Sequence, residues 1–226
     1  MRACDRGVPL CEGLKKSYPG FVLGPLSLEV AHGSVVGLFG PNGSGKTTLL
    51  LMLLGLVRPT EGRALFPLAD VSASMEGTGL LGDVTVSDYL SATAGITARS
   101  GVERDVARTC GIDSYMGTRV RHLSMGNRQR LMIALMLVED AGLMVFDEPL
   151  NGLDPEGIRW FSAVLRDLKE RGKTVILSSH LLQEVESFID ACIFLRRGRL
   201  LYDGEFSRLR ELVARRLRAP APGPTG

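Results

Sequence analysis

The chain alternates between short apolar runs and longer amphipathic stretches. Runs typical of buried strands occupy residues 35–39, 143–146 and 174–177. The stretches 46–56 and 155–170 have the length and apolar content of helices. Strands that alternate with helices in this way predict an α/β fold with a mostly parallel sheet.

Two other segments depart from this alternation. Residues 14–30 and 62–75 predict short, poorly regular strands, which we expect to form a short antiparallel β subdomain. Residues 83–137 are mostly helical in pattern, with breaks predicted at Gly95, Gly101, Gly111 and Gly117. This stretch interrupts the alternation of strands and helices, and it predicts an inserted helical subdomain over about 77–137.

The end of the chain completes the predicted domain. Residues 193–195 and 200–202, separated by Arg-Arg-Gly-Arg, predict a hairpin. Residues 211–226 end in a run rich in proline and are predicted to be a disordered tail. With 226 residues in all, the chain is expected to form a single domain over 1–210.

Composition excludes several function classes. The chain has 27 basic and 25 acidic residues, so no general nucleic-acid partner is expected. Its longest apolar run, Leu49 to Val57, is nine residues long, whereas a membrane span needs about 20. The sequence opens without a basic and apolar leader, and its four cysteines are scattered without metal-ligand spacing. We therefore expect an unexported chain in a reducing compartment.

A glycine-rich motif follows the first buried run. It fits the pattern G-x-x-x-x-G-K-[ST] and consists of Gly40, Pro41, Asn42, Gly43, Ser44, Gly45, Lys46 and Thr47, with Thr48 next in the chain. Its glycines let backbone N–H groups surround phosphate oxygens, and the helix after it adds the positive end of its dipole. Lys46 can reach the β- and γ-phosphates, and the Thr47 hydroxyl can ligate Mg²⁺. The third glycine of a dinucleotide fingerprint is missing, so the motif predicts a nucleoside-triphosphate site.

Two adjacent carboxylates follow the second buried run. Asp147 comes directly after residues 143–146, where a buried strand would present it beside the phosphate loop to hold Mg²⁺. Glu148 lies one residue further on, placed to polarise an attacking water. The alternative for two adjacent carboxylates, a solvated loop, is disfavoured by the four apolar residues that precede them.

With these motifs, residues 10 to 208 resemble the ATP-binding subunit of an ABC transporter. Residues 123–130 (LSMGNRQR) resemble the signature of that family, residues 151–154 (NGLD) its D-loop, and residues 178–180 (SSH) its switch segment. Each match alone is weak, but their order along the chain is highly specific. The resemblance implies a P-loop NTPase fold of RecA-like type and an ATPase that uses ATP and Mg²⁺.

The resemblance also implies roles for residues outside the phosphate loop. Tyr18 matches the aromatic side chain that stacks on adenine, with a core tyrosine as the alternative. Ser124 and Gly126 are expected to meet the γ-phosphate of ATP on an opposing subunit, and Asp154 lies in the D-loop. His180 is expected to contact the γ-phosphate and orient Glu148, with a structural histidine as the alternative. Two chains would thus pack head to tail around two Mg·ATP.

Three positions depart from the family pattern. Met125 replaces a glycine and Asn127 a glutamine in the signature, although the Ser124 and Gly126 pair is intact. Alignment of the following segment places Glu76 where glutamine is usual. A carboxylate there can contact Mg²⁺ more strongly than an amide, but it also brings negative charge near the triphosphate. A glutamate at this position resembles exporter ATPases of the bacitracin and lantibiotic type. A locally shifted alignment is the alternative.

The resemblance implies partners as well. A separate transmembrane permease would hold the chain at the cytoplasmic face of the cell membrane, and residues 76–95 would receive a permease helix. Candidate contacts there are Leu80, Leu81 and Tyr89, which can equally be core residues of the helical subdomain. We expect a homodimer that drives export. Alternatives are an import ATPase, a soluble ABC-type ATPase on ribosomes or nucleic acid, a heterodimer with one degenerate site, and a regulator that does not hydrolyse nucleotide.

Overall fold

A computed structural model describes residues 7–75, 79–180, 185–209 and 211 of the chain. The strands are β1 (Val8–Tyr18), β2 (Phe21–Val30), β3 (Val35–Phe39), β4 (Glu61–Ala64), β5 (Val71–Ser74), β6 (Leu143–Phe146), β7 (Thr174–Ser179), β8 (Ala191–Arg196) and β9 (Arg199–Glu205). The helices are α1 (Lys46–Leu53), α2 (Val86–Ile96), α3 (Glu103–Thr109), α4 (Met125–Glu139) and α5 (Pro155–Glu170), with 3₁₀ turns at Leu68–Asp70, Asp113–Tyr115 and Val120–His122.

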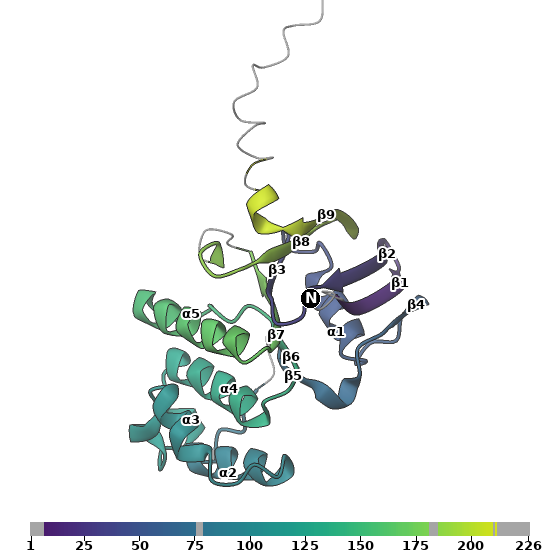
Figure 1. The fold of residues 1–226 in the computed structure, drawn as a ribbon. Coiled ribbons are helices and arrows are strands. Elements are labelled where there is room, and N and C mark those ends of the chain that lie inside the picture. The colour runs from purple at the N-terminus through teal and green to yellow at the C-terminus, as the bar shows by residue number, and fades with distance from the viewer. Residues whose placement is uncertain (1–6, 76–78, 181–184, 210, 212–226) are drawn as a thin grey trace, which may run out of the picture.

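Two sheets organise the molecule. Within the described part of the chain, the larger sheet has six strands in the order β5-β6-β7-β3-β8-β9, all parallel except β9. The smaller sheet is antiparallel, in the order β2-β1-β4. Figure 1 shows α4 and α5 on one side of the large sheet, and α1 with the small sheet on the other. The predicted α/β fold with a mostly parallel sheet and a small antiparallel one is confirmed.

Each face of the large sheet has its own apolar core. On β3, Val35 and Phe39 pack with residues of α4 and α5, including Phe161. Val36 and Leu38 point the other way and pack with α1 and the small sheet. This alternation follows from the two-residue period of a strand. Both faces of β3 are therefore buried, which explains why its sequence is apolar throughout.

Most predicted elements appear where the sequence placed them. Residues 35–39 and 143–146 are β3 and β6, residues 155–170 are α5, and the hairpin is β8 with β9. The helix predicted over 46–56 is shorter, because α1 ends at Leu53 and Gly55 turns the chain with a φ of +69°.

The prediction for residues 14–30 was wrong in length. β1 and β2 have 11 and 10 residues and form one long hairpin. Register shifts in β1, between Pro9 and Cys11 and again between Cys11 and Leu14, break the strict alternation of apolar and polar positions. The sequence pattern consequently looked shorter and less regular than the pairing it supports.

The helical segment contains α2, α3 and α4. The break predicted at Gly95 was wrong, because Gly95 lies inside α2, and a Cβ there would meet nothing within 4 Å. α2 ends instead at Ile96, with Thr97 as its C-cap, before Ala98 at a φ of +54°. The domain limits predicted at 77, 210 and 211 fall at or near residues outside those described, so they stay a prediction.

Candidate functional site

The phosphate loop connects β3 to α1 in a glycine-rich turn. Gly40 has a φ of +152°, and a Cβ on it would lie 2.2 Å from the Leu195 carbonyl oxygen and 2.6 Å from Ser44 Oγ. Gly45 caps the N-terminus of α1 at a φ of +106°, a conformation that L side chains rarely adopt. Only glycine fits both positions without strain. The loop therefore passes close to β8 and folds back on its own Ser44.

Lys46 lies inside this loop. Its Nζ donates to the Gly40 carbonyl oxygen at 2.9 Å and lies 3.9 Å from Glu148 Oε1. The side chain is only 8% exposed, so its charge is held in a poorly solvated position. Residues 41–48 and Glu148 line a hollow of about 330 Å³ in front of it.

Asp147 and Thr47 meet at the end of β6. Thr47 Oγ1 donates to Asp147 Oδ2 at 3.4 Å, and Ser178 Oγ donates to Asp147 Oδ1 at 2.6 Å. β6 and β7 are parallel neighbours, which brings the ends of these strands together at one edge of the sheet. The structure thus brings the hydroxyl and the carboxylate predicted to hold Mg²⁺ into contact.

The donors at this edge fit Mg²⁺. That ion prefers oxygen ligands, and it commonly takes one or two from protein and the rest from phosphate and water. Thr47 and Asp147 supply a hydroxyl and a carboxylate oxygen side by side. Among the described residues, no group of three or more His, Cys, Asp or Glu side chains is placed to hold a metal ion. An Mg²⁺ ion here would take its other ligands from phosphate and water.

Glu148 has a left-handed backbone conformation. Its φ is +52°, in the left-handed region that non-glycine residues rarely enter, and its N–H donates to Ser178 Oγ at 2.9 Å. Its carboxylate Oε2 lies 3.0 Å from His180 Nδ1. Strain of this kind is retained where surrounding contacts hold it and where position matters for function. The structure brings Glu148 and His180 together, as expected from the sequence.

Ser178 is a site residue that sequence reasoning missed. It is fully buried, and its one hydroxyl touches both acidic residues. The prediction named His180 in the segment 178–180 and left the serine without a role. The available signal was a polar pair, Ser178 and Ser179, at the end of an otherwise apolar buried strand.

The signature segment begins α4. Ser124 is the N-cap, and its Oγ accepts from the Asn127 N–H at 3.2 Å, so a free backbone donor at the helix start is already satisfied. Ser124 and Met125 are exposed. The Met125 side chain packs against Gly152, where an added Cβ would lie 2.7 Å from Met125 Cγ. The departure from glycine at 125 thus ties the signature to the loop after β6.

Three further predicted residues have separate outcomes. Asp154 is the N-cap of α5 and accepts from the Gly157 N–H at 2.7 Å, which is a structural role. Tyr18 ends β1 and is 42% exposed, which does not fit the core-tyrosine alternative. The Lys16 Nζ lies 5.3 Å from its ring centroid. Glu76 lies outside the described residues.

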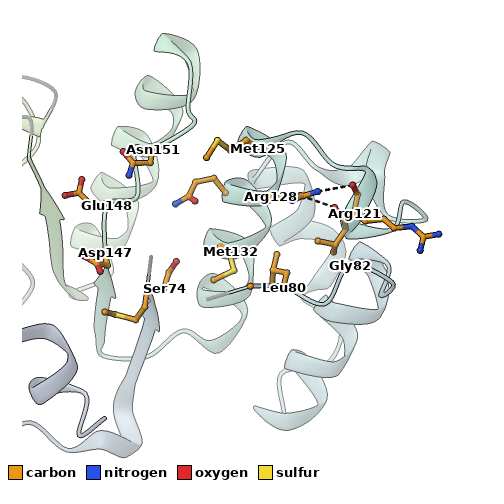
Figure 2. A pocket seen from close by; sticks show the side chains of 14 residues that line it. Ser74, Leu80, Gly82, Arg121, Met125, Arg128, Met132, Asp147, Glu148 and Asn151 are labelled. Carbon is orange, nitrogen blue, oxygen red and sulfur yellow. Dashed lines mark hydrogen bonds between the residues drawn. The ribbon is translucent and has the colours of Figure 1, made fainter. Parts of the chain in front are cut away.

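A larger cavity, of about 380 Å³, opens beside the acidic pair. It lies between the loop after β6, the end of β5 and α4, and Figure 2 shows Glu148 and Asn151 on one side of it and Met125 and Met132 on the other. Arg128 closes one wall by donating to the carbonyl oxygens of Val120 and Arg121. The cavity connects the acidic pair to the segment 79–82, which reaches its floor.

Comparison with known proteins decides the family. The sequence model described as ABC transporter matches residues 23–151. This chain belongs to the ABC transporter family. It is therefore an ABC ATP-binding chain, of the family that hydrolyses ATP in transport. The resemblance seen in the sequence is confirmed.

Several relatives of this ABC ATPase are named as transport proteins. The chain is 31% identical over 208 residues to the lantibiotic transport ATP-binding protein SrtF of Streptococcus pyogenes, covering 86% of this chain and 90% of that one. It is 33% identical over 201 residues to the bacitracin transport ATP-binding protein BcrA of Bacillus licheniformis, covering 82% of this chain and 65% of that one. A solved ATP-binding subunit of an ABC transporter superposes with a TM-score of 0.84 at 24% identity, covering 95% of each chain, which supports the fold.

Within the described residues, the helices are too short or too polar to cross a membrane.

Proposed function

We propose that this ABC ATPase binds Mg·ATP at the loop 40–48 and hydrolyses it with Glu148 as the general base. The observation that carries the proposal is the position of the Glu148 carboxylate between Lys46 Nζ, at 3.9 Å, and His180 Nδ1, at 3.0 Å. A cation and an imidazole on either side can hold the carboxylate in place beside the hollow lined by the phosphate loop.

Each residue of the proposed site would have a separate role. Lys46 would exchange its contact with the Gly40 carbonyl oxygen for the β- and γ-phosphates, helped by the N-terminus of α1. Glu148 would accept a proton from the attacking water, and His180 would keep the carboxylate oriented. Mg²⁺, when bound by Thr47 and Asp147, supplies positive charge to the phosphate oxygens. Ser44 Oγ, buried and without a hydrogen-bond partner among the described residues, is available to a ligand in the loop.

We also propose that two copies close around two nucleotides. Ser124 and Met125 are exposed at the N-terminus of α4, where backbone donors and the helix dipole favour an anion. Gly126 follows in the first turn. The phosphate loop precedes α1, whereas the signature residues begin α4. We infer that the α4 N-terminus of one copy meets the nucleotide held by the phosphate loop of the other. A head-to-tail homodimer would unite them, and the intact Ser124 and Glu148 favour two equivalent sites.

A separate permease is the proposed partner. Leu81 is 67% exposed beside the cavity, whereas Leu80 and Tyr89 pack partly against the apolar core of the helical segment. Leu81 is thus the better candidate for a permease contact, and the other two act as its support. Purification of the tagged chain from detergent-solubilised membranes tests this partner. A co-purifying protein with several membrane spans is expected, whereas ribosomal proteins or nucleic acid would favour the soluble alternative.

Export is the proposed direction, supported by the names of SrtF and BcrA. We propose that the cargo is a peptide of the lantibiotic or bacitracin kind. Expression of the chain with its permease in a sensitive bacterium is expected to raise the minimal inhibitory concentration of such a peptide. The Glu148→Gln variant with the same permease is the control, and equal resistance from both would contradict ATP-driven export.

A further inference from the structure

Three arginines crowd the turn between β8 and β9. Arg196, Arg197 and Arg199, which we call the arginine turn, are all exposed. Arg196 and Arg199 are direct cross-strand partners, and like charges in that position destabilise a hairpin. Arg197 has a φ of +48°, a region unfavourable for arginine. Charge and backbone are therefore both unfavourable within four residues.

These charges are not compensated within the protein as described. None of the three arginines forms an ion pair with another described residue, whereas Arg99, Arg121 and Arg171 each pair with a carboxylate. Together with Leu201 they line an open hollow of about 480 Å³. Residues that lower local stability, as these charges and this φ do, are expected where a segment serves a function. An excess of positive charge indicates an anionic ligand.

The arginine turn is attached directly to the phosphate loop. Gly198, in its centre, donates from its N–H to the Ser44 carbonyl oxygen at 3.0 Å and accepts from the Gly24 N–H at 2.8 Å. A Cβ at position 198 would lie 1.8 Å from the Val22 carbonyl oxygen, so the turn is pressed against β2. The three charges are thus held at a fixed place beside the loop that would receive the nucleotide.

The side chains inside the phosphate site carry more negative than positive charge. Cationic side chains outside the site would therefore help to attract an anionic nucleotide. Lys46 is accompanied there by Asp147 and Glu148, which gives one positive and two negative side chains. A nucleoside triphosphate is itself an anion, even with Mg²⁺ bound. Its approach to a site with this balance is slowed unless positive charge nearby attracts it.

We propose that the arginine turn attracts the anionic nucleotide and raises its association rate, without touching the phosphates once they are bound. The proposal rests on the proposed nucleotide site at residues 40–48. It assigns a role to a turn that neither the phosphate motif nor the signature contains. Because the effect acts through space, it depends on ionic strength more than a contact would.

Stopped-flow fluorescence with Mg²⁺ and a ribose-labelled fluorescent ATP tests the proposal. The test variant replaces Arg196, Arg197 and Arg199 by Gln. The control variant replaces Arg104, Arg159 and Arg166 by Gln, which removes the same charge from exposed positions on α3 and α5. Those helices lie across the large sheet from α1 (Figure 1). Arg197→Gly is a second test variant, because it removes one charge and relieves the φ of +48°.

At about 20 mM salt, the triple test variant is expected to bind about 5-fold more slowly than the control variant, with an unchanged dissociation rate. The difference should vanish at 0.5 M salt, where the screening length is about 4 Å. Arg197→Gly should show about a 2-fold loss and a melting temperature no lower than that of the unmodified chain.

Two results would overturn the proposal. One is equal association rates for the test and control variants at low salt. The other is a change confined to the dissociation rate, which would indicate a direct contact with bound nucleotide. Failure of the nucleotide site itself is distinguishable, because the unmodified chain would then bind no fluorescent ATP at any salt concentration.

Discussion

The His180 imidazole Nδ1 lies 3.0 Å from Glu148 Oε2, although 32 residues separate the two along the chain. His180 follows directly after β7 and Glu148 lies two residues after β6, and these strands are parallel neighbours. The Glu148 side chain is 11% exposed, while that of His180 is 47% exposed. The pair therefore has one member that is largely buried and one that is exposed.

Replacement of Glu148 by Gln is expected to slow ATP hydrolysis at least about 100-fold, because the amide cannot accept the proton from water. ATP binding should persist, since Lys46 and the loop are unchanged. Phosphate release and size-exclusion chromatography with ATP measure the two effects, and an ATP-bound dimer should accumulate. Glu170→Gln, on the exposed end of α5, is the control. A Glu148→Gln chain with normal turnover would sink the general-base assignment.

Lys46→Ala is expected to weaken nucleotide binding at least about 10-fold, because a charge-assisted contact to phosphate is lost. Isothermal titration calorimetry with ATP measures the affinity. Lys169→Ala removes an exposed lysine that pairs with Asp190 far from the loop, and it should bind ATP normally. Unchanged affinity in Lys46→Ala would count against the phosphate-loop interpretation.

Ser178→Ala is expected to slow hydrolysis about 10-fold or more, because Asp147 and the Glu148 backbone lose the hydroxyl that positions both. Unfolding free energy should also fall by about 1–3 kcal/mol, since buried groups lose their partner. Thr174→Val is the matched control. Thr174 is buried at the other end of β7 and its Oγ1 accepts from the Gly33 N–H.

The control should lose a similar amount of stability and keep its hydrolysis rate. Phosphate release and urea unfolding, carried out on both variants, separate the two effects. If Ser178→Ala and Thr174→Val behave alike in both assays, Ser178 has only a structural role.

Asp140 is expected to contribute stability in a pH-dependent way. Burial raises the pKa of its carboxyl, but the hydrogen bonds from Arg99 and Lys173 and the charge of Arg171 outweigh burial, so the pKa lies below its usual value of 3.8. A lowered pKa in the folded state means that the stabilisation is complete above pH 3.8. It is lost as the pH falls through the folded-state pKa.

The variant Asp140→Asn should therefore lose about 1–3 kcal/mol of unfolding free energy at pH 7. The loss should be constant between pH 7 and 5 and should shrink below pH 3.8. Asp167→Asn removes the exposed partner of the same Arg171 and should stay within about 0.5 kcal/mol of the unmodified chain. Urea unfolding at several pH values measures both. A loss that persists unchanged at the lowest pH would contradict the ionic contribution.

The sequence by itself determined three kinds of element. These are the strands that are buried on both faces, the glycine-rich phosphate loop and the amphipathic helix α5. Residues 35–39 and 143–146 could be predicted to be strands because every position is apolar, as a strand in the middle of a sheet requires. The phosphate loop could be predicted because glycines at 40 and 45 are needed for its conformation. Helix α5 was predictable because its apolar residues recur along one face and Asp154 and Pro155 begin it.

Only the tertiary structure decided how these parts meet. The length of β1 was hidden by its register shifts, which pairing with β2 and β4 tolerates. The bridge from Ser178 to Asp147 and the contact of His180 with Glu148 depend on the parallel pairing of β6 and β7. The attachment of the arginine turn to Ser44 depends on the neighbouring positions of β3 and β8. Pairing between segments that are distant in sequence is a property of the whole sheet, so no local pattern of residues records it.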